Sequence, residues 1–105
     1  MIIEYEQNYL QELYQEGKCR DKKHYFQPQV VKKYQNRIDT LITTTCKEDL
    51  FVFHSLHFEA LHGDKAGLYS IRVDNQYRIE FSIKELGTKA SITIARIFKL
   101  SNHYK

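Results

Sequence analysis

The chain has 105 residues, enough for one domain with a single hydrophobic core but not for two independent domains. No apolar run approaches the roughly 18 residues of a membrane-spanning helix, and the N-terminus has no basic segment followed by a long apolar one. We therefore expect a soluble, cytoplasmic protein with one domain over residues 1–105, and membrane-spanning classes are excluded.

Positive charge is unevenly distributed, although the formal net charge is only +3. Residues 17–37 carry seven Lys or Arg against one Asp, and residues 65–105 carry eight against three acids. If folding brings these two segments together, they form a positive surface suited to a nucleic-acid backbone, with an affinity that falls as salt rises. A solvated charged loop is the alternative for residues 18–23.

The first third of the chain predicts a short strand, a helix and a loop. Residues 1–5 have the apolar character of a strand, and Gly17 supplies a stop for the helix that follows. A basic loop, residues 18–27, comes next. One apolar stripe marks the helix, formed by Leu10, Leu13 and Tyr14.

A second helix is the clearest helical pattern in the chain. Pro28 stands where the first residue of a helix tolerates proline, and three threonines, residues 43–45, end the pattern. Between them, apolar residues recur three and four positions apart, namely Val31, Tyr34, Ile38, Leu41 and Ile42.

The second half of the chain predicts a meander of strands. Residues 46–62 carry the weakest pattern, a helical turn near Lys-Glu-Asp-Leu-Phe and then an extended approach. Strands follow at about 68–73, 77–84 and 91–100, the last two separated by a loop at Gly87. Because each helix has a single apolar stripe, we expect an α+β fold with two N-terminal helices on one face of a small, mainly antiparallel twisted sheet. The other face should be partly open.

Alternation places two arginines on that open face. In the segment 63–83, Arg72 and Arg78 lie opposite the apolar face. If residues 74–76 make a hairpin turn, the two strands can bury their apolar faces together only in a register that places Arg72 directly opposite Arg78. The apolar face consists of odd-numbered residues only, Tyr69, Ile71, Val73, Tyr77, Ile79, Phe81 and Ile83.

The paired arginines favour an anion between them. Like charges directly opposite each other on two strands destabilise a sheet by up to roughly 1 kcal/mol. A phosphate between Arg72 and Arg78 would remove that cost. The alternative is that Glu80 and a neighbouring acid such as Asp64 neutralise the pair, and the segment alone favours neither.

Two histidines are candidates for acid–base chemistry. Cleaving RNA without a metal needs a base, an acid and cations or donors that meet the developing charge. His62 immediately precedes the Gly-Asp-Lys turn, and His103 with Tyr104 follows the last strand, where short loops commonly carry site groups. An exposed loop histidine and a frayed terminus are the alternatives.

No metal or cofactor site is indicated. The gaps between His54, His57 and His62 match no standard zinc motif, and Cys19 and Cys46 form no CxxC pair. Nucleotide-binding and common hydrolase motifs are also missing from the sequence. We therefore expect reduced cysteines, no metal and no cofactor.

The run LHFEALHGDKAGLYSIRVDNQYRIEFSI, followed by a terminal KLSNHYK, resembles the HigB branch of the RelE-like toxins, also described as plasmid maintenance system killer proteins. The resemblance is closest over residues 56–105, and the helix order upstream agrees with the family plan. It implies a bacterial type II toxin, an endoribonuclease that enters the ribosomal A site and cuts mRNA by metal-independent acid–base catalysis. A cognate HigA-like helix-turn-helix antitoxin would hold it inactive.

The resemblance also assigns residues. The family's arginine at the start of the second hairpin strand matches Arg78, and its terminal histidine matches His103. Its basic residue before the Gly-Asp turn falls on His62, and a family histidine three positions earlier falls on Glu59, so both positions depart from the pattern. The residues before the terminal histidine are often Asp-Tyr in the family, but here they are Ser101 and Asn102, with Tyr104 after the histidine.

These two lines of argument predict a site. We expect Arg78, supported by Arg72, to neutralise the scissile phosphate, with His62 and His103 as acid and base in an unassigned order. Glu59 is a second candidate base, and Tyr104 is expected to stack on a base or donate a proton. Ribosomal RNA phosphates would be held, without reading sequence, by Lys22, Lys23, Lys32, Lys33 and Lys65.

Two other functions stay open from the sequence. The same scaffold carries ParE-like toxins, which poison gyrase and need no RNA-cutting residues. A basic RNA-binding module without catalysis is the second alternative. Arg78 and the terminal histidine favour the nuclease over the gyrase poison.

Overall fold

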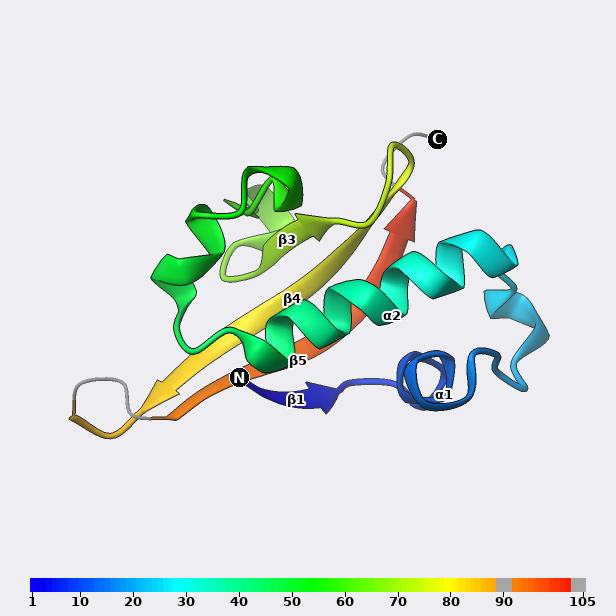
Figure 1. Cartoon of the computed structure of the whole chain (residues 1–105), viewed down its shortest axis with the longest axis horizontal. Coiled ribbons are helices and arrows are strands. Elements are labelled where there is room, and N and C mark those ends of the chain that lie inside the picture. The colour runs from blue at the N-terminus through cyan, green and yellow to red at the C-terminus, as the bar shows by residue number, and fades with distance from the viewer. Residues whose placement is uncertain (89–91, 103–105) are drawn as a thin grey trace.

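The computed structural model describes residues 1–88 and 92–102 and has the expected α+β fold (Figure 1). Its helices are α1 (Asn8–Glu16) and α2 (Pro28–Thr43). Its strands are β1 (Ile2–Tyr5), β2 (Glu59–Ala60), β3 (Tyr69–Arg72), β4 (Tyr77–Leu86) and β5 (Ile92–Asn102). Four short 3₁₀ turns lie between them, η1 (Lys22–His24), η2 (Lys47–Phe51), η3 (His54–Leu56) and η4 (Gly63–Lys65).

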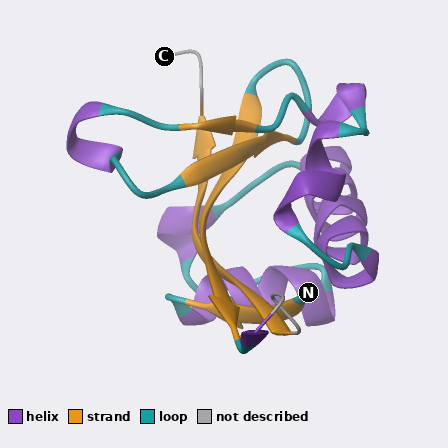
Figure 2. Ribbon diagram, turned by 90° about the vertical axis from the view of Figure 1, so that its left-hand side faces the viewer, coloured by secondary structure: helices purple, strands orange, loops and turns teal. Residues whose placement is uncertain are grey.

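The strands form one five-stranded sheet in the order β1-β5-β4-β3-β2. Strand β1 runs parallel to β5, and the other neighbours are antiparallel. Helix α2 lies on one face of the sheet, whereas the loop with η4 projects from the other side (Figure 2). Helix α1 packs against α2 and against β1 and β5. The expected architecture of two helices on a mainly antiparallel sheet is confirmed.

The helices bury the apolar stripes that define them. Leu10 and Leu13 of α1 are buried, and Gly17 ends α1 in a left-handed conformation with a φ of 76°. Tyr34 of α2 is fully buried, and its hydroxyl donates a hydrogen bond of 2.8 Å to the Leu10 carbonyl. This bond satisfies the one polar atom that the buried ring carries, and it joins α1 to α2.

The expectation that Ile42 belongs to the buried stripe of α2 is wrong. Leu41 is fully buried, but Ile42 is 43% exposed. One residue turns a helix by about 100°, so Ile42 lies beside the stripe rather than on it. The position is also in the last turn, since α2 ends at Thr43.

Two strands are longer than the side-chain pattern predicts. Strand β4 continues to Leu86, and β5 continues to Asn102, which pairs with Tyr77. Backbone pairing does not require apolar side chains, so a strand predicted from its alternating apolar residues ends too early. A β-bulge shifts the register between Glu80 and Phe81 and changes which residues of β5 face the core.

Candidate active site

The register of the β3–β4 hairpin is the one that the alternation predicts. Ile71 pairs with Ile79, and Arg72 pairs with Arg78. The apolar partners are buried against α2, so both arginines lie on the opposite face. The predicted juxtaposition of two guanidinium groups over the open side of the sheet is therefore confirmed.

The hairpin turn holds Arg72 in place. A carboxylate oxygen of Asp74 accepts hydrogen bonds of 2.8 and 2.7 Å from the backbone N–H groups of Gln76 and Tyr77, which closes the turn. Arg72 in turn donates from Nε to the Asp74 carbonyl at 3.1 Å and from Nη2 to the Asn75 side-chain oxygen. These partners are neutral, so the turn orients the guanidinium without cancelling its charge.

Arg78 is balanced by two carboxylates at longer range. Its Nη1 lies 3.7 Å from Glu59 Oε1, and its Nε lies 3.6 Å from Glu80 Oε2. Glu80 is buried and has a closer partner, Lys65 Nζ, at 2.8 Å. Arg78 Nε is buried without a hydrogen-bond partner in the described part of the chain. A buried donor of this kind is rare and indicates a water molecule or a ligand.

The alternative of a neutralised pair is therefore half correct. Glu80 does lie against Arg78, but Asp64 forms no ion pair with either arginine among the described residues. Glu59 takes the place expected for Asp64. Among the residues that the structure describes, no carboxylate forms an ion pair with Arg72, so its positive charge lies beside this partly balanced group and favours the binding of an anion.

A pocket of about 200 Å³ lies over the two arginines. Its walls come from β2, β3, β4, the hairpin turn and the segment before β2. The lining residues are His57, Glu59, Ser70, Arg72, Asp74, Asn75, Tyr77 and Arg78. Two cations, two carboxylates, an imidazole and a phenol thus converge on one cavity, and these are the groups that acid–base chemistry on a phosphodiester uses.

His57 is the histidine that the structure places beside the arginines. Its Nε2 lies 3.4 Å from Arg72 Nη1. An arginine only donates hydrogen bonds, so a hydrogen bond between these two atoms requires Nε2 as the acceptor and the ring proton on Nδ1. His57 also has a φ of 47°, the only positive value at a non-glycine residue in the described ranges. Such backbone strain is concentrated at functional sites.

The sequence pattern offers His57 only as a zinc ligand and does not reveal this position beside Arg72. The signal lies in the pairing of β2 with β3, which sets Glu59 opposite Ser70. Continuing that register by two residues brings His57 opposite Arg72. A two-residue strand has no side-chain pattern that could reveal such a pairing in advance.

The other candidates for acid–base chemistry are distributed as follows. Glu59 lines the pocket, as its role requires. His62 is exposed immediately before η4 and does not line the pocket. His103 and Tyr104 lie outside the described residues. The structure thus brings together Arg72, Arg78 and Glu59 but leaves His62 apart from them.

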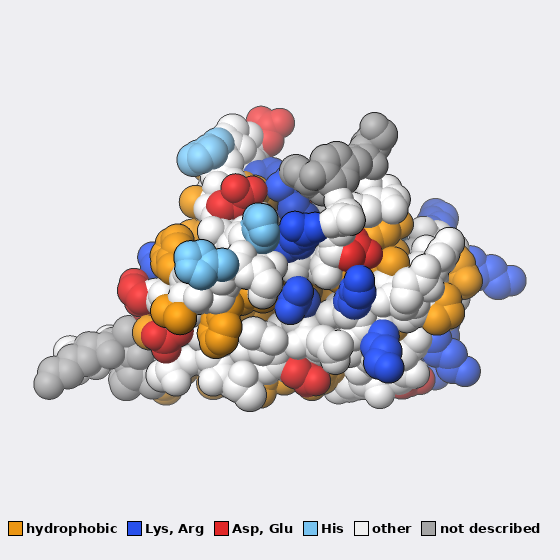
Figure 3. All heavy atoms as spheres, turned by 45° about the horizontal axis from the view of Figure 1, so that its top comes forward, with side chains coloured by type: hydrophobic (Ala, Val, Ile, Leu, Met, Phe, Trp, Pro, Cys, Tyr) orange, Lys and Arg blue, Asp and Glu red, His pale blue; other side chains and the backbone are white. Residues whose placement is uncertain are grey.

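A second, basic pocket of about 420 Å³ adjoins the first on the side of α2. Lys33 and Arg37 line it together with His57 and Arg72. Arg37 Nε donates a hydrogen bond of 2.8 Å to the Arg72 carbonyl, which ties α2 to β3. Blue Lys and Arg side chains gather in the middle of this face beside pale-blue histidines (Figure 3). The basic segments around 17–37 and 65–105 therefore do meet.

The five candidate lysines have different surroundings. Lys32 and Lys33 are exposed on α2, and Lys22 and Lys23 are exposed on η1. Lys65 is held by Glu80, so part of its charge is already used. Four of the five are thus free to meet a polyanion, and Lys65 has a structural partner.

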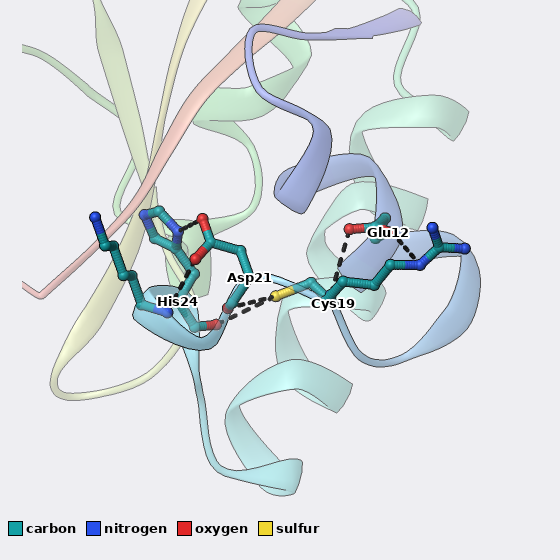
Figure 4. Close-up of polar contacts among 6 residues, drawn as sticks. Glu12, Cys19, Asp21 and His24 are labelled. Atoms are coloured by element: carbon teal, nitrogen blue, oxygen red, sulfur yellow. Dashed lines mark hydrogen bonds and ion pairs between the residues drawn. The ribbon is translucent and has the colours of Figure 1, made fainter.

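The loop that carries Lys22 and Lys23 is ordered by its own polar contacts (Figure 4). The Cys19 thiol donates to the carbonyls of Asp21 and His24 at 3.5 and 3.4 Å. His24 Nδ1 lies 2.8 Å from the Asp21 carboxylate, and its ring stacks on Tyr9 at 3.7 Å. Burial raises the pKa of the Cys19 thiol, which disfavours the reactive thiolate form.

Within residues 1–88 and 92–102, no three His, Cys, Asp or Glu side chains gather in a way that could hold a metal ion. Neither helix has the length and apolar character needed to cross a bilayer, in the part of the chain that the structure describes. Both cysteines, Cys19 and Cys46, are free.

Comparison with known proteins gives one family. The family model described as the RelE-like toxin of the type II toxin–antitoxin system HigB matches residues 3–92. A search of curated proteins finds no match.

Two solved structures share the fold. One is a YoeB/ParE toxin from Agrobacterium tumefaciens, with a TM-score of 0.55, 18% identity, and coverage of 99% of this chain and 100% of that chain. The other is YafQ from E. coli strain BL21(DE3), with a TM-score of 0.58, 15% identity, and coverage of 96% and 91%. At these identities the likeness shows the fold alone.

Proposed function

Because this chain belongs to the HigB-like toxins, the RelE-like toxins of type II toxin–antitoxin systems, we propose that it is a ribosome-dependent mRNA endonuclease that acts in the A site. The observation that carries the proposal is the pairing of Arg72 with Arg78 beneath a pocket that also contains His57 and Glu59. A binding module needs the positive charge alone. Acid–base groups beside that charge favour catalysis.

The proposed reaction is attack of a ribose 2′-hydroxyl on the adjacent phosphorus. The bond to the 5′ oxygen breaks, a cyclic phosphate forms, and one proton leaves the nucleophile while another reaches the leaving oxygen. Arg72 and Arg78 would neutralise the charge that develops on the phosphoryl oxygens, and the unsatisfied Nε of Arg78 would gain its acceptor there. This chemistry requires no metal ion.

The pocket contains two groups suited to removing the 2′-hydroxyl proton. Glu59 and His57 both line it, and the Nε2 of His57 carries a free lone pair once Arg72 is drawn to phosphate. His103 and Tyr104 remain proposed partners for the second proton transfer, and His62, which does not line the pocket, is the weaker candidate. His103 and Tyr104 follow β5, in which Ser101 pairs with Arg78.

The ribosome would supply the remaining contacts. Lys22, Lys23, Lys32 and Lys33 are exposed and are proposed to meet ribosomal RNA phosphates, with Lys65 as a weaker contributor because it already meets Glu80. Membership of a type II toxin family implies an antitoxin partner. We propose that this partner is a HigA-like helix-turn-helix protein and that the toxin acts in the cytoplasm.

A cleavage assay on ribosomes programmed with a defined message tests the proposal. We expect the native chain to cut in the A site, equally well with and without EDTA. The double variant His62→Ala, His103→Ala measures whether the two histidines assigned from the sequence take part. Unchanged cutting by that variant would remove them from the site.

The same assay separates the alternatives. Intact message together with inhibited gyrase supercoiling would identify a ParE-like poison. Intact message together with salt-dependent ribosome binding would identify a non-catalytic RNA-binding module.

A further inference from the structure

The turn after α2 leaves two aromatic side chains largely exposed. Leu50 of η2 is fully buried and anchors the turn, but Phe51 is 60% exposed and Phe53 is 49% exposed. Large exposed apolar side chains that lie close together mark an interaction site. Because these side chains lie next to the candidate active site, the patch is placed to contact the same ligand.

Phe51 and Phe53 line a third cavity, of about 200 Å³, here called the aromatic pocket. It is lined by Leu50, Phe51, Phe53, His54, His57 and Phe58. Phe51 meets Phe58 edge to face at 4.8 Å, and Phe58 is stacked on Tyr69 at 5.2 Å. The partly buried Phe58 therefore fixes one wall, and the exposed faces of Phe51 and Phe53 form the accessible part.

The aromatic pocket is continuous with the candidate active site through one residue. His57 lines the aromatic pocket, the arginine pocket and the basic pocket of Lys33 and Arg37. In Figure 3, orange hydrophobic side chains and blue cations lie on either side of pale-blue histidines. A ligand that spans these cavities must be anionic at one end and flat and apolar at the other.

A nucleotide of single-stranded RNA has these properties. Its phosphate is anionic, and its base offers a π-face that stacks on Phe or His side chains whatever the sequence. Among the residues that the structure describes, none that lines the aromatic pocket carries a carboxylate that would repel the phosphate backbone. A different pocket that Phe53 also lines includes Asp49 and Val52.

We propose that the aromatic pocket is a stacking site for a nucleobase of the message, next to the scissile phosphate. This inference rests on the proposed function, because the phosphate at Arg72 and Arg78 determines which base is in reach. Phe51 and Phe53 stack on the base, and His57 marks the boundary between base and phosphate. The pocket therefore positions the nucleotide rather than taking part in bond breaking.

The test uses a fluorescent probe that the protein cannot cut. A fully 2′-O-methylated RNA hexamer carrying one 2-aminopurine, placed at each position in turn, reports stacking by loss of fluorescence. We expect the native protein to quench the probe at one or two positions. The double variant Phe51→Leu, Phe53→Leu keeps apolar bulk but removes the ring faces, and it should abolish the quenching. Binding should weaken about 5- to 150-fold for the loss of one stacked base.

Val52→Ala is the matched control, since Val52 is 69% exposed in the same turn but does not line the aromatic pocket. Its quenching and affinity should equal those of the native protein. Circular dichroism and thermal unfolding establish that each variant is folded. The single variant Phe51→Tyr retains an aromatic ring at this position and keeps Phe53. It should therefore show most of the quenching that the double-leucine variant loses.

The outcomes separate this proposal from the proposed function. Quenching that persists in the double-leucine variant overturns the stacking site, even if the native protein cuts message on ribosomes. Native quenching without any cutting supports the stacking site and removes the nuclease. Unchanged RNA binding with lost neutralisation by the cognate antitoxin would make the patch a protein-binding surface and overturn the proposal.

Discussion

Arg96 and Arg72 occupy the same face of the same sheet but have opposite surroundings. Arg96 lies on β5 opposite Glu4, and its guanidinium meets Glu4 at 3.1 Å and Glu6 at 2.7 Å. Hydrogen bonds to these two carboxylates raise the pKa of Arg96. Arg72 lies opposite another arginine, and its described side-chain contacts are a carbonyl, an amide oxygen and an imidazole.

The difference teaches how to separate a structural arginine from one available to a ligand. The cross-strand neighbour decides: a carboxylate completes the ion pair within the fold, whereas a second guanidinium leaves charge for something outside it. An exposed ion pair such as that of Arg96 is worth little to stability and nothing to anion binding. The Arg72–Arg78 pair, by contrast, is stabilised most when an anion binds between the two guanidinium groups.

The strongest test of this comparison replaces arginines one at a time. Arg78→Ala removes a donor aimed at the proposed phosphate and should lower the rate of message cleavage on ribosomes by about 100-fold or more. Arg72→Ala should have a comparable effect, and it leaves no carboxylate without a partner. Arg96→Ala is the control and should change the rate less than about threefold. Equal effects of all three substitutions would invalidate the distinction.

A smaller effect is expected from the histidines. His57→Ala should lower the cleavage rate by about 10- to 100-fold, near the lower limit for an acid–base group because Glu59 is a second candidate base in the same pocket. His62→Ala should change it less than about threefold, since His62 does not line that pocket. Single-turnover rates on programmed ribosomes measure both. A larger loss at His62 than at His57 would restore the sequence-based assignment.

The pattern of side chains along the sequence is sufficient to predict where the two arginines lie, but it is insufficient to predict which histidine lies beside them. Arg72 and Arg78 lie on long, alternating strands, in which period two and a short turn leave only one register that buries both apolar sets. His57 lies between a 3₁₀ turn and a two-residue strand, with a positive φ. Its place depends on tertiary pairing that no local periodicity encodes.

The same dependence on tertiary pairing explains why the sequence predicts only one of the two acidic partners of Arg78 and why it misplaces Ile42 at the end of α2. Glu80 was recognisable as a partner of Arg78 because it lies two residues along the same strand. Glu59 reaches Arg78 only through the pairing of β2 with β3, so sequence proximity suggested Asp64 instead. Ile42 fits the helical spacing, but whether the last turn is covered depends on the neighbouring elements.

Alkaline pH should lower the free energy of unfolding, because the ionisation of Tyr5 in β1 is unfavourable in the folded protein. Burial raises the pKa of Tyr5 to about 12, followed in importance by the neighbouring Tyr14 and Asp39. The unfolded chain releases this proton near pH 10. Stability linked to Tyr5 is therefore complete below pH 10 and is lost as the pH rises from 10 to 12.

Urea unfolding at pH 8, 10, 11 and 12 measures this loss. Tyr5→Phe should show a smaller decrease between pH 10 and 12 than the native chain, although burial also raises the pKa of Tyr9 and Tyr34. An identical decrease in both proteins would show that the Tyr5 hydroxyl makes no contribution.

The smallest effect is expected where the ion pairs look most complete. The double variant Glu4→Gln, Glu6→Gln should change the free energy of unfolding by less than about 1 kcal/mol, because both carboxylates and Arg96 are exposed or partly exposed. Message cleavage should stay at the native rate. A loss of cleavage here would show that the charge on Arg96 matters for RNA and would remove the contrast with Arg72.

The most direct test is a structure of the protein on a ribosome with a message whose A-site riboses are 2′-O-methylated. The account predicts one phosphate between the guanidinium groups of Arg72 and Arg78, within hydrogen-bond distance of the Nε of Arg78, with His57 or Glu59 facing the blocked 2′ oxygen. A message phosphate held at Arg96 or on the lysines of α2, with the arginine pocket empty, would contradict it.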